Sequence, residues 1–132
     1  MNFYIASRLN NVDQVRYVAN ILKSNGWTHT YDWTNFDLSS EDTPNTLRII
    51  GEREYDAVKA ADIVFVITPQ GRGTHIELGM AIALEKRVYI YHVDDSYFKC
   101  DDNTCPFYWL PKVKQLTGKI ENAVEIILQE NK

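Results

Sequence analysis

The chain has 132 residues and a mass of 15.3 kDa, with 45% hydrophobic and 24% charged residues. This size and composition predict a single domain over residues 1–132 and exclude a disordered or low-complexity protein. The 14 basic and 18 acidic residues give a net charge of −4, which argues against nucleic acid or an anionic membrane as the partner.

The longest uninterrupted apolar run, residues 63–67, is far shorter than the roughly 20 residues that cross a bilayer. The first residues lack the basic and apolar regions of a secretory signal, so we expect no membrane partner and a cytoplasmic location. Cys100 and Cys105 form a C-x4-C pair, which allows a disulfide or half of a metal site. We expect free thiols, because the compartment is reducing, a structural zinc needs four ligands, and His92 is the only nearby histidine.

The first half of the chain alternates strand-like and helix-like segments. A β-rich run at residues 2–6 precedes apolar residues with helical spacing from Val12 to Leu22, and Gly26 ends that predicted helix. Residues 27–33 alternate Trp27, His29, Tyr31 and Trp33 with Thr or Asp, which predicts a second strand with an aromatic face. Most of these aromatic side chains are expected to pack in the core.

The remaining pattern predicts, in chain order, a polar loop over 34–45, a helix over 46–61, a buried strand over 62–68, a helix over 74–86, a buried strand over 88–92, an irregular connection over 94–111, a short strand over 113–116 and a helix over 119–129. The alternation and the apolar central strands predict a flavodoxin-like α/β fold. Its five-stranded parallel sheet is doubly wound, with strand order 2-1-3-4-5 and helices on both faces.

Such sheets bind ligands beyond the carboxyl ends of their strands. Four segments follow predicted strands and are therefore candidates for the site: Ser7 and Arg8, Asp32 and Trp33, residues 68–73, and residues 92–94. Ser7 with Arg8 can hold a hydroxyl or a phosphate. Trp33 is the aromatic residue best placed to stack on a base.

Residues 70–79, QGRGTHIELG, form a glycine-containing loop that leaves a buried strand and opens a helix. Backbone N–H groups at such a position bind anions, so the candidate binding residues here are Gln70, Gly71, Gly73 and Thr74. The segment lacks the Walker and dinucleotide fingerprints. Two interpretations of Thr74 and Glu77 stay open: a capping box, or a first-turn carboxylate that faces the cleft and is held ionised by the helix dipole as a nucleophile.

Glu54 falls within the apolar stripe of the predicted helix over 46–61, together with Leu47 and Ile50, so its carboxyl faces inward. A buried carboxyl must be paired or have a raised pKa, and both outcomes suit a general acid or a group that binds a substrate hydroxyl. The alternative is a glutamate that reaches the helix edge or pairs with Arg8 or Arg48.

Ser7 and Arg8 after the first strand, Glu54 eight residues before Asp62, and the segment GTHIELGMA at 73–81 together resemble the nucleoside 2-deoxyribosyltransferase family, which includes 2'-deoxynucleoside 5'-phosphate N-hydrolases. The resemblance implies that Glu77 is the nucleophile that attacks the anomeric carbon. It implies that Glu54 contacts the base or sugar, and that Ser7 and Arg8 bind the sugar or 5'-phosphate.

Two family positions differ here. The tyrosine that the family places on the first strand aligns with Phe3, and Tyr4 is expected on the opposite face of the sheet. The polar residue that the family places six positions before the nucleophile is Gly71.

The resulting hypothesis is cleavage or transfer at the N-glycosidic bond of a (deoxy)ribonucleoside or nucleotide. Glu77 displaces the base from C1', and water or a second base resolves the glycosyl-enzyme, with assistance from Glu54. We expect no metal, no organic cofactor, a nucleoside or nucleotide as the small-molecule partner and, by the resemblance, a homo-oligomer such as a dimer. The alternatives are a TIR-like NAD glycohydrolase, a non-catalytic module that binds a nucleotide-derived ligand, and an interaction scaffold with a vestigial cleft.

Overall fold

The computed structural model describes residues 1–35 and 43–132. These residues contain a parallel sheet with strand order β2-β1-β3-β4-β5, which confirms the predicted fold class. The strands are β1 (Asn2–Ala6), β2 (Thr28–His29), β3 (Ile63–Ile67), β4 (Arg87–His92) and β5 (Val113–Thr117). The α-helices are α1 (Val12–Ser24), α2 (Pro44–Ala60), α3 (Arg72–Ala83) and α4 (Ile120–Glu130).

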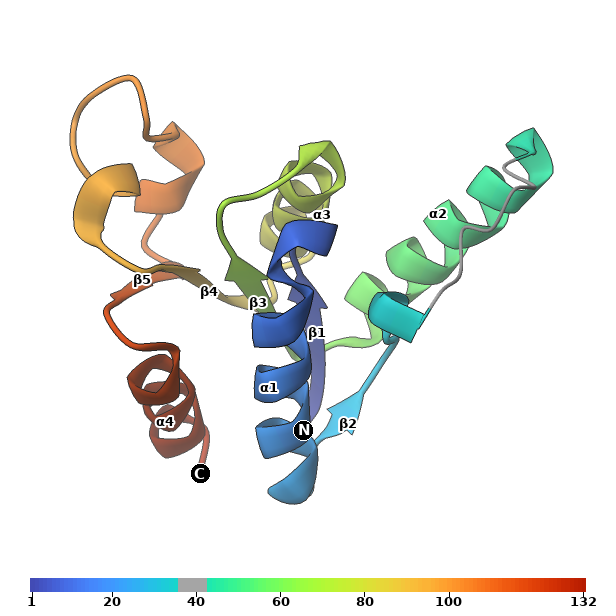
Figure 1. The fold of residues 1–132 in the computed structure, drawn as a ribbon, viewed down its shortest axis with the longest axis horizontal. Helices are drawn as coiled ribbons and strands as arrows, with labels where there is room; N and C mark the ends of the chain where they lie inside the picture. The colour runs from blue at the N-terminus through green and yellow to red at the C-terminus, as the bar shows by residue number, and fades with distance from the viewer. Residues whose placement is uncertain (36–42) are drawn as a thin grey trace.

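The helices cover the two faces of the sheet in pairs. The helix α1 contacts α4, and α2 contacts α3. This pairing follows from the strand order: the connection from β1 to β2 runs in one direction across the sheet, and those from β2 to β3 and from β3 to β4 run in the other. With right-handed crossovers, α1 and the α2–α3 pair then lie on opposite faces (Figure 1).

The core is built on the two central strands. All residues of β3 are buried, as are Phe3, Tyr4, Ile5 and Ala6 of β1. Side chains point alternately to the two faces of a strand, so Tyr4 and Ala6 face one helix layer, and Phe3 and Ile5 face the other. This alternation decides which residues of β1 reach the site.

The predicted strand over residues 27–33 is wrong beyond its first residues. Only Thr28 and His29 pair with β1, and Trp33 opens a short 3-10 helix, Trp33–Asn35. The reason is local hydrogen bonding: the Asp32 carboxylate accepts from the backbone N–H and hydroxyl of Thr34, which favours a turn over continued strand pairing. The expected packing role of His29 is confirmed, since its ring stacks on Phe3 with centroids 4.5 Å apart.

The helix α2 is anchored mainly at its carboxyl end. It begins at Pro44, where Thr43 accepts a hydrogen bond from the Thr46 N–H, and not at residue 46 as predicted. Its buried residues are Ala57 and Val58, and its amino-terminal part extends away from the sheet (Figure 1). The expectation that Leu47 belongs to an inward stripe is wrong, since this side chain is 56% exposed. Most of the predicted loop, residues 36–42, lies outside the described residues.

The other predicted elements are present, with ends shifted by a few residues at most. The irregular connection between β4 and β5 contains two short 3-10 helices, Asp95–Tyr97 and Pro106–Trp109. Cys100 is exposed and Cys105 is half-buried, and the two do not form a disulfide with each other. Among the described residues, no helix has the length and apolar character needed to cross a membrane.

Candidate active site

A cleft of about 230 Å³ lies beyond the carboxyl end of β1, between α2 and the first turns of α3. It brings together every predicted site residue except Asp32 and Gln70, and adds Leu9 and Ile50. The lining residues are Ser7, Arg8, Leu9, Trp33, Ile50, Glu54, Gly71, Gly73, Thr74 and Glu77. Segments far apart in the sequence therefore meet at the edge of the sheet where doubly wound folds bind ligands.

Glu77 lies in the second turn of α3, because that helix begins at Arg72, two residues earlier than predicted. The proposed capping box of Thr74 and Glu77 is therefore wrong. Gly71 is the N-cap residue, and its N–H donates to Thr74 Oγ1 at 3.2 Å. The same hydroxyl donates to the carbonyl of Ser7 at 2.9 Å, which ties the start of α3 to the end of β1. Glu77 takes no part in capping and is 5% exposed in the cleft wall.

Tyr4 is the direct hydrogen-bonding partner of Glu77. The Tyr4 hydroxyl donates to Glu77 Oε2, and both side chains are buried. The expectation that Tyr4 faces away from the site is wrong: Phe3 packs on His29 on the other face, so the next residue points towards α3. A signal was present in the sequence, because a tyrosine hydroxyl in a fully buried strand needs a polar partner.

Burial raises the pKa of Glu77 to about 8; the hydrogen bond from Tyr4 opposes this shift, and the charge of Glu54 adds to it. Glu77 is therefore mostly protonated at neutral pH. The prediction that the helix dipole holds it ionised is wrong, because the loss of hydration on burial outweighs that interaction. Burial also raises the pKa of Glu54 and of the Tyr4 hydroxyl.

Glu54 is half-buried and faces the same cleft. Among the described residues it forms no ion pair, and Arg48 pairs instead with Glu52 on the exposed side of α2, at 3.7 Å. The structure thus favours the inward-facing interpretation over the paired one. The negative charge of Glu54 also raises the pKa of Glu77, so removing the charge of Glu54 would make Glu77 easier to ionise.

Ser7 and Arg8 differ in how much of their hydrogen-bonding capacity the fold already uses. The Ser7 hydroxyl donates to the carbonyl of Ile67 at 2.8 Å and accepts from Asn11 at 2.9 Å, so it joins the ends of β1 and β3. The Nε atom of Arg8 is buried and has no hydrogen-bond partner within the described part of the chain. Arg8 is therefore the better candidate to contact a polar group of a ligand.

Trp33 is 9% exposed and lines the cleft, and its indole N–H donates to the carbonyl of Ile5 at 2.8 Å. Asp32 does not reach the cleft, because its carboxylate caps the turn described above. Gln70 is also directed elsewhere, to Tyr108 and His75.

Within residues 1–35 and 43–132, no group of three His, Cys, Asp or Glu side chains lies close enough together to hold a metal ion.

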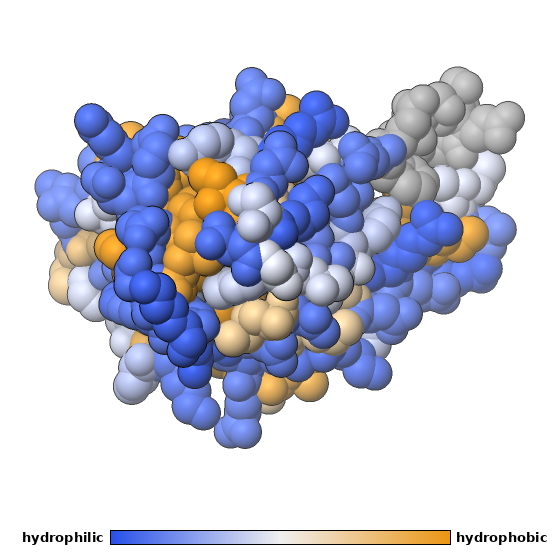
Figure 2. All heavy atoms as spheres, turned by 90° about the horizontal axis from the view of Figure 1, so that it is seen from below, coloured by the Kyte–Doolittle hydropathy of each residue, from blue (hydrophilic) through white to orange (hydrophobic). Residues whose placement is uncertain are grey.

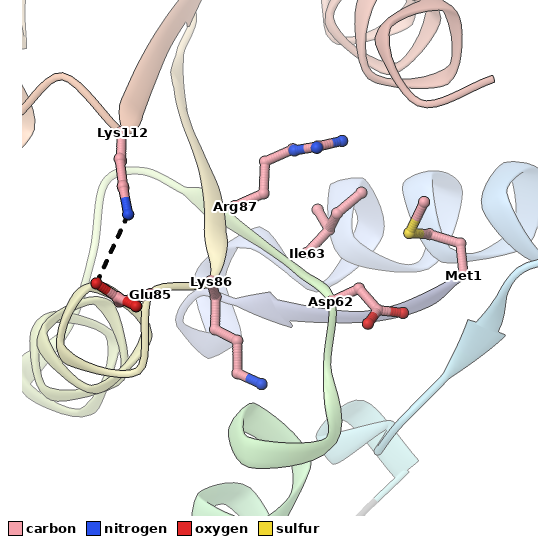
Figure 3. Close-up of a pocket in the computed structure, with 7 residues that line it drawn as sticks. All are labelled: Met1, Asp62, Ile63, Glu85, Lys86, Arg87 and Lys112. Carbon is pink, nitrogen blue, oxygen red and sulfur yellow. Dashed lines mark ion pairs between the residues drawn. The ribbon is translucent and has the colours of Figure 1, made fainter.

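A larger hollow of about 730 Å³ lies at the opposite edge of the sheet, near the amino ends of β3 and β4 (Figure 3). Seen from below the view of Figure 1, the surface of the molecule is mostly hydrophilic and surrounds an apolar strip (Figure 2). The polar groups of the hollow already have partners: Lys112 pairs with Glu85 at 3.8 Å, and Asp62 accepts from the N–H of Asn2 at 2.8 Å. The smaller cleft, with its two carboxyl groups and arginine, is the candidate active site.

The fold and this cleft define an α/β protein with a doubly wound sheet and two carboxyl groups, one buried and one half-buried, in a cleft at the sheet edge. The family model for nucleoside 2-deoxyribosyltransferase matches residues 3–123, so the chain belongs to this family of enzymes. Among curated proteins, no sequence match to the chain was found.

Solved structures share the fold at low sequence identity. A CMP N-glycosidase, BcmB, from Clostridium botulinum has a TM-score of 0.68 and 16% identity, covering 96% of this chain and 98% of that one. A conserved protein from Enterococcus faecalis V583 has a TM-score of 0.70 and 13% identity, with 98% of each chain covered. A 2-deoxyribosyltransferase from Bacillus psychrosaccharolyticus has a TM-score of 0.56 and 23% identity, over 69% of this chain and 72% of that one.

Proposed function

We propose that this protein cleaves or transfers at the N-glycosidic bond of a (deoxy)ribonucleoside or nucleotide, with Glu77 as the nucleophile. The observation that carries the proposal is a buried Glu77 carboxyl in the cleft wall, hydrogen-bonded by Tyr4 and facing the same space as Glu54. Membership of the nucleoside 2-deoxyribosyltransferase family supports glycosidic-bond chemistry.

In the first step, a carboxylate oxygen of Glu77 forms a bond to C1' while the bond from C1' to the base nitrogen breaks. The bonding electron pair leaves with the base, which takes a proton from Glu54. In the second step, water or another base attacks C1' and gives a proton to the Glu54 carboxylate, while the bond from C1' to Glu77 breaks and Glu77 departs as a carboxylate. Two carboxyl groups that flank the reacting bond are the arrangement that retaining glycosidases use for the same type of transition state.

Tyr4 and Glu54 have distinct parts in this proposal. The hydrogen bond from Tyr4 to Oε2 stabilises the ionised carboxylate and leaves Oε1 for the sugar. Burial raises the pKa of Glu54, which favours the protonated form that can give a proton to the leaving base. In the reacting arrangement, Glu54 holds a proton and Glu77 is ionised.

The rest of the cleft supplies binding groups. Arg8 and the backbone amides near Gly71 and Gly73 are suited to the sugar hydroxyls or a phosphate, and Trp33 to the base. A volume of about 230 Å³ is below the roughly 300–1,000 Å³ of most ligand pockets, so the enclosed part suits the sugar better than a whole nucleotide.

The predicted homo-oligomer belongs to the same proposal. Two apolar side chains of α2, Leu47 and Tyr55, are 56% and 48% exposed, and Ile50 of the same helix lines the cleft. A second copy packed on α2 would bury this surface and enclose the cleft further. The cytoplasmic location stays a prediction.

The test is a chromatographic assay for free base. Wild type, Glu77→Gln and Glu52→Gln are incubated with nucleosides, their 5'-monophosphates and NAD, with and without an acceptor base. We expect base release by wild type and by Glu52→Gln, which alters an exposed glutamate of α2, and none by Glu77→Gln. Base release by Glu77→Gln at the wild-type rate would remove Glu77 from the mechanism.

A second candidate, a module that binds a nucleotide-derived ligand without turnover, is favoured by one observation. With a pKa of about 8, Glu77 is mostly protonated in the free protein at neutral pH, and a protonated carboxyl is a poor nucleophile. This function predicts saturable binding, measured by calorimetry, with no base released from any substrate. Base release from NAD alone would favour the TIR-like alternative.

A further inference from the structure

A second cavity, of about 520 Å³, lies on the other side of α3, between that helix and the connection from β4 to β5. Its size is within the range of about 300–1,000 Å³ that is typical of ligand pockets. It shares no lining residue with the cleft of Glu77. The lining residues are Gln70, His75, Leu78, Gly79, Asp102, Asn103, Thr104, Cys105, Phe107 and Tyr108.

A hydrogen-bonded cluster of Gln70, His75 and Tyr108 forms one wall of this cavity. The buried hydroxyl of Tyr108 lies 2.7 Å from Gln70 Nε2 and 2.8 Å from His75 Nε2, and those two nitrogens are 3.2 Å apart. The His75 and Tyr108 rings are nearly parallel, at 11°, with centroids 6.0 Å apart. The cluster thus fixes the Gln70 amide and two aromatic planes relative to one another.

Only one end of the Gln70 side-chain amide has hydrogen-bond partners. Its Oε1 atom is buried and has no hydrogen-bond partner within the described part of the chain. If the Gln70 amide is turned by 180°, its oxygen accepts hydrogen bonds from Tyr108 and His75, and its NH₂ group is then the end without a partner. In either orientation one end of a buried amide is free, which costs free energy unless a ligand or water bonds to it.

The charge of the lining restricts the ligand further. The lining residues contain no lysine or arginine, and Asp102 is an acid, so a phosphate group is disfavoured. Phe107 is 58% exposed and offers a ring face for stacking. An amide edge beside aromatic faces, in a wall without positive charge, suits a flat, uncharged molecule with donor and acceptor groups on its rim.

We propose that this cavity is a second ligand site, for a free nucleobase. The Gln70 side chain turns to bring its buried Oε1 atom to the rim of the base, and Phe107 stacks on the face of the base. Binding here does not require catalysis by Glu77, although under the proposed function a free base is also a product of the reaction. The site is connected to the cleft through the chain: Gln70 precedes Gly71, whose N–H bonds to Thr74 in the cleft wall.

The experiment is an NMR titration of ¹⁵N-labelled protein with adenine, cytosine and adenosine 5'-monophosphate. We expect adenine or cytosine to shift the amide signals of Gln70, Thr104 and Phe107, and the monophosphate to leave these signals unchanged. Gln70→Met and Phe107→Ala are each expected to weaken base binding at least tenfold. Phe107→Ala is the safer variant for folding because the side chain is exposed.

Glu77→Gln separates the two proposals. It is expected to abolish turnover and to change the affinity of the second cavity less than twofold, so loss of the proposed reaction leaves the binding result intact. Base-induced shifts confined to residues of the Glu77 cleft, no shifts with either base, or an affinity equal to that of the wild type in both Phe107→Ala and Gln70→Met would each overturn the second site.

Discussion

The hydroxyl of Tyr4, in the middle of β1, donates a hydrogen bond to the carboxyl of Glu77, which lies 73 positions further along the chain on α3. Both groups are buried, and the surrounding lining carries a second carboxyl, Glu54. The donor from Tyr4 partly offsets the burial that raises the pKa of Glu77. The bond therefore affects how readily Glu77 ionises.

Tyr4→Phe should lower kcat/KM at neutral pH by about 10- to 100-fold, because a hydrogen bond to a charged group contributes roughly 1.5–3 kcal/mol. The loss should diminish at high pH, where Glu77 ionises without help. The assay is base release against pH. Phe3→Leu is the matched control, since Phe3 packs on the other face of the sheet; a larger loss in that variant than in Tyr4→Phe would contradict the assignment.

The kcat/KM of the wild type should fall as the pH rises through about 8, because both carboxyl groups are then ionised and Glu54 has no proton for the leaving base. In Glu54→Gln the ionisation midpoint of Glu77 itself should move to lower pH, since the negative charge that raises the pKa of Glu77 is gone. Carbon-detected NMR titration of the Glu77 carboxyl follows the same change without turnover. A Glu77 midpoint near 4.5 in the wild type would show that burial does not perturb this group.

Glu77→Gln should stabilise the fold at alkaline pH. The pKa of Glu77 is raised from 4.5 to about 8, so its protonated form favours the folded state below pH 4.5, and that contribution is lost as the pH rises to about 8. The variant keeps a neutral side chain throughout, and the difference in unfolding free energy should reach roughly 2–5 kcal/mol above pH 8. Urea unfolding at pH 5 and pH 9 measures it. Equal differences at the two pH values would argue against the buried acid.

Trp33→Phe should destabilise the protein by about 1–3 kcal/mol, because the carbonyl of Ile5 loses its hydrogen bond from the indole N–H and is left unsatisfied. Thermal or urea unfolding checks this value. Trp109→Phe is the control, since that indole bonds to the Thr104 hydroxyl at the surface and its loss should cost little. If both variants unfold alike, the bond to Ile5 is not a significant contribution.

Arg8→Gln should raise KM more for a nucleoside 5'-monophosphate than for the nucleoside if the cleft binds a phosphate. The reason is that Arg8 is the one basic residue among the described residues that line the cleft. Steady-state kinetics on the matched pair of substrates measures the ratio. Arg53→Gln, on the exposed side of α2, should leave both KM values unchanged. Equal effects of Arg8→Gln on both substrates would assign the guanidinium to the sugar or base.

The sequence predicted the strand order and most of the cleft because both depend on patterns that are local in the chain. Buried parallel strands appear as continuous apolar runs, and right-handed connections then leave few possible orders for the sheet. Once β1 and β3 are adjacent, the residues that follow them must meet. Ser7, Arg8, Gly71 and Thr74 were predicted together for this reason, and the inward position of Glu54 followed from the helical period of α2.

Other features depended on contacts between distant segments, and only the tertiary structure decided them. The side of β1 that faces α3 is set by how the helices pack, so Tyr4 and not Phe3 reached Glu77. The start of α3 was set by Gly71 and by the bond from Thr74 to Ser7, which moved Glu77 into the second turn. The raised pKa of Glu77 followed from its burial among residues of several elements. The local sequence does not contain this information, because the free-energy cost of removing a charge from water depends on everything that surrounds the charge.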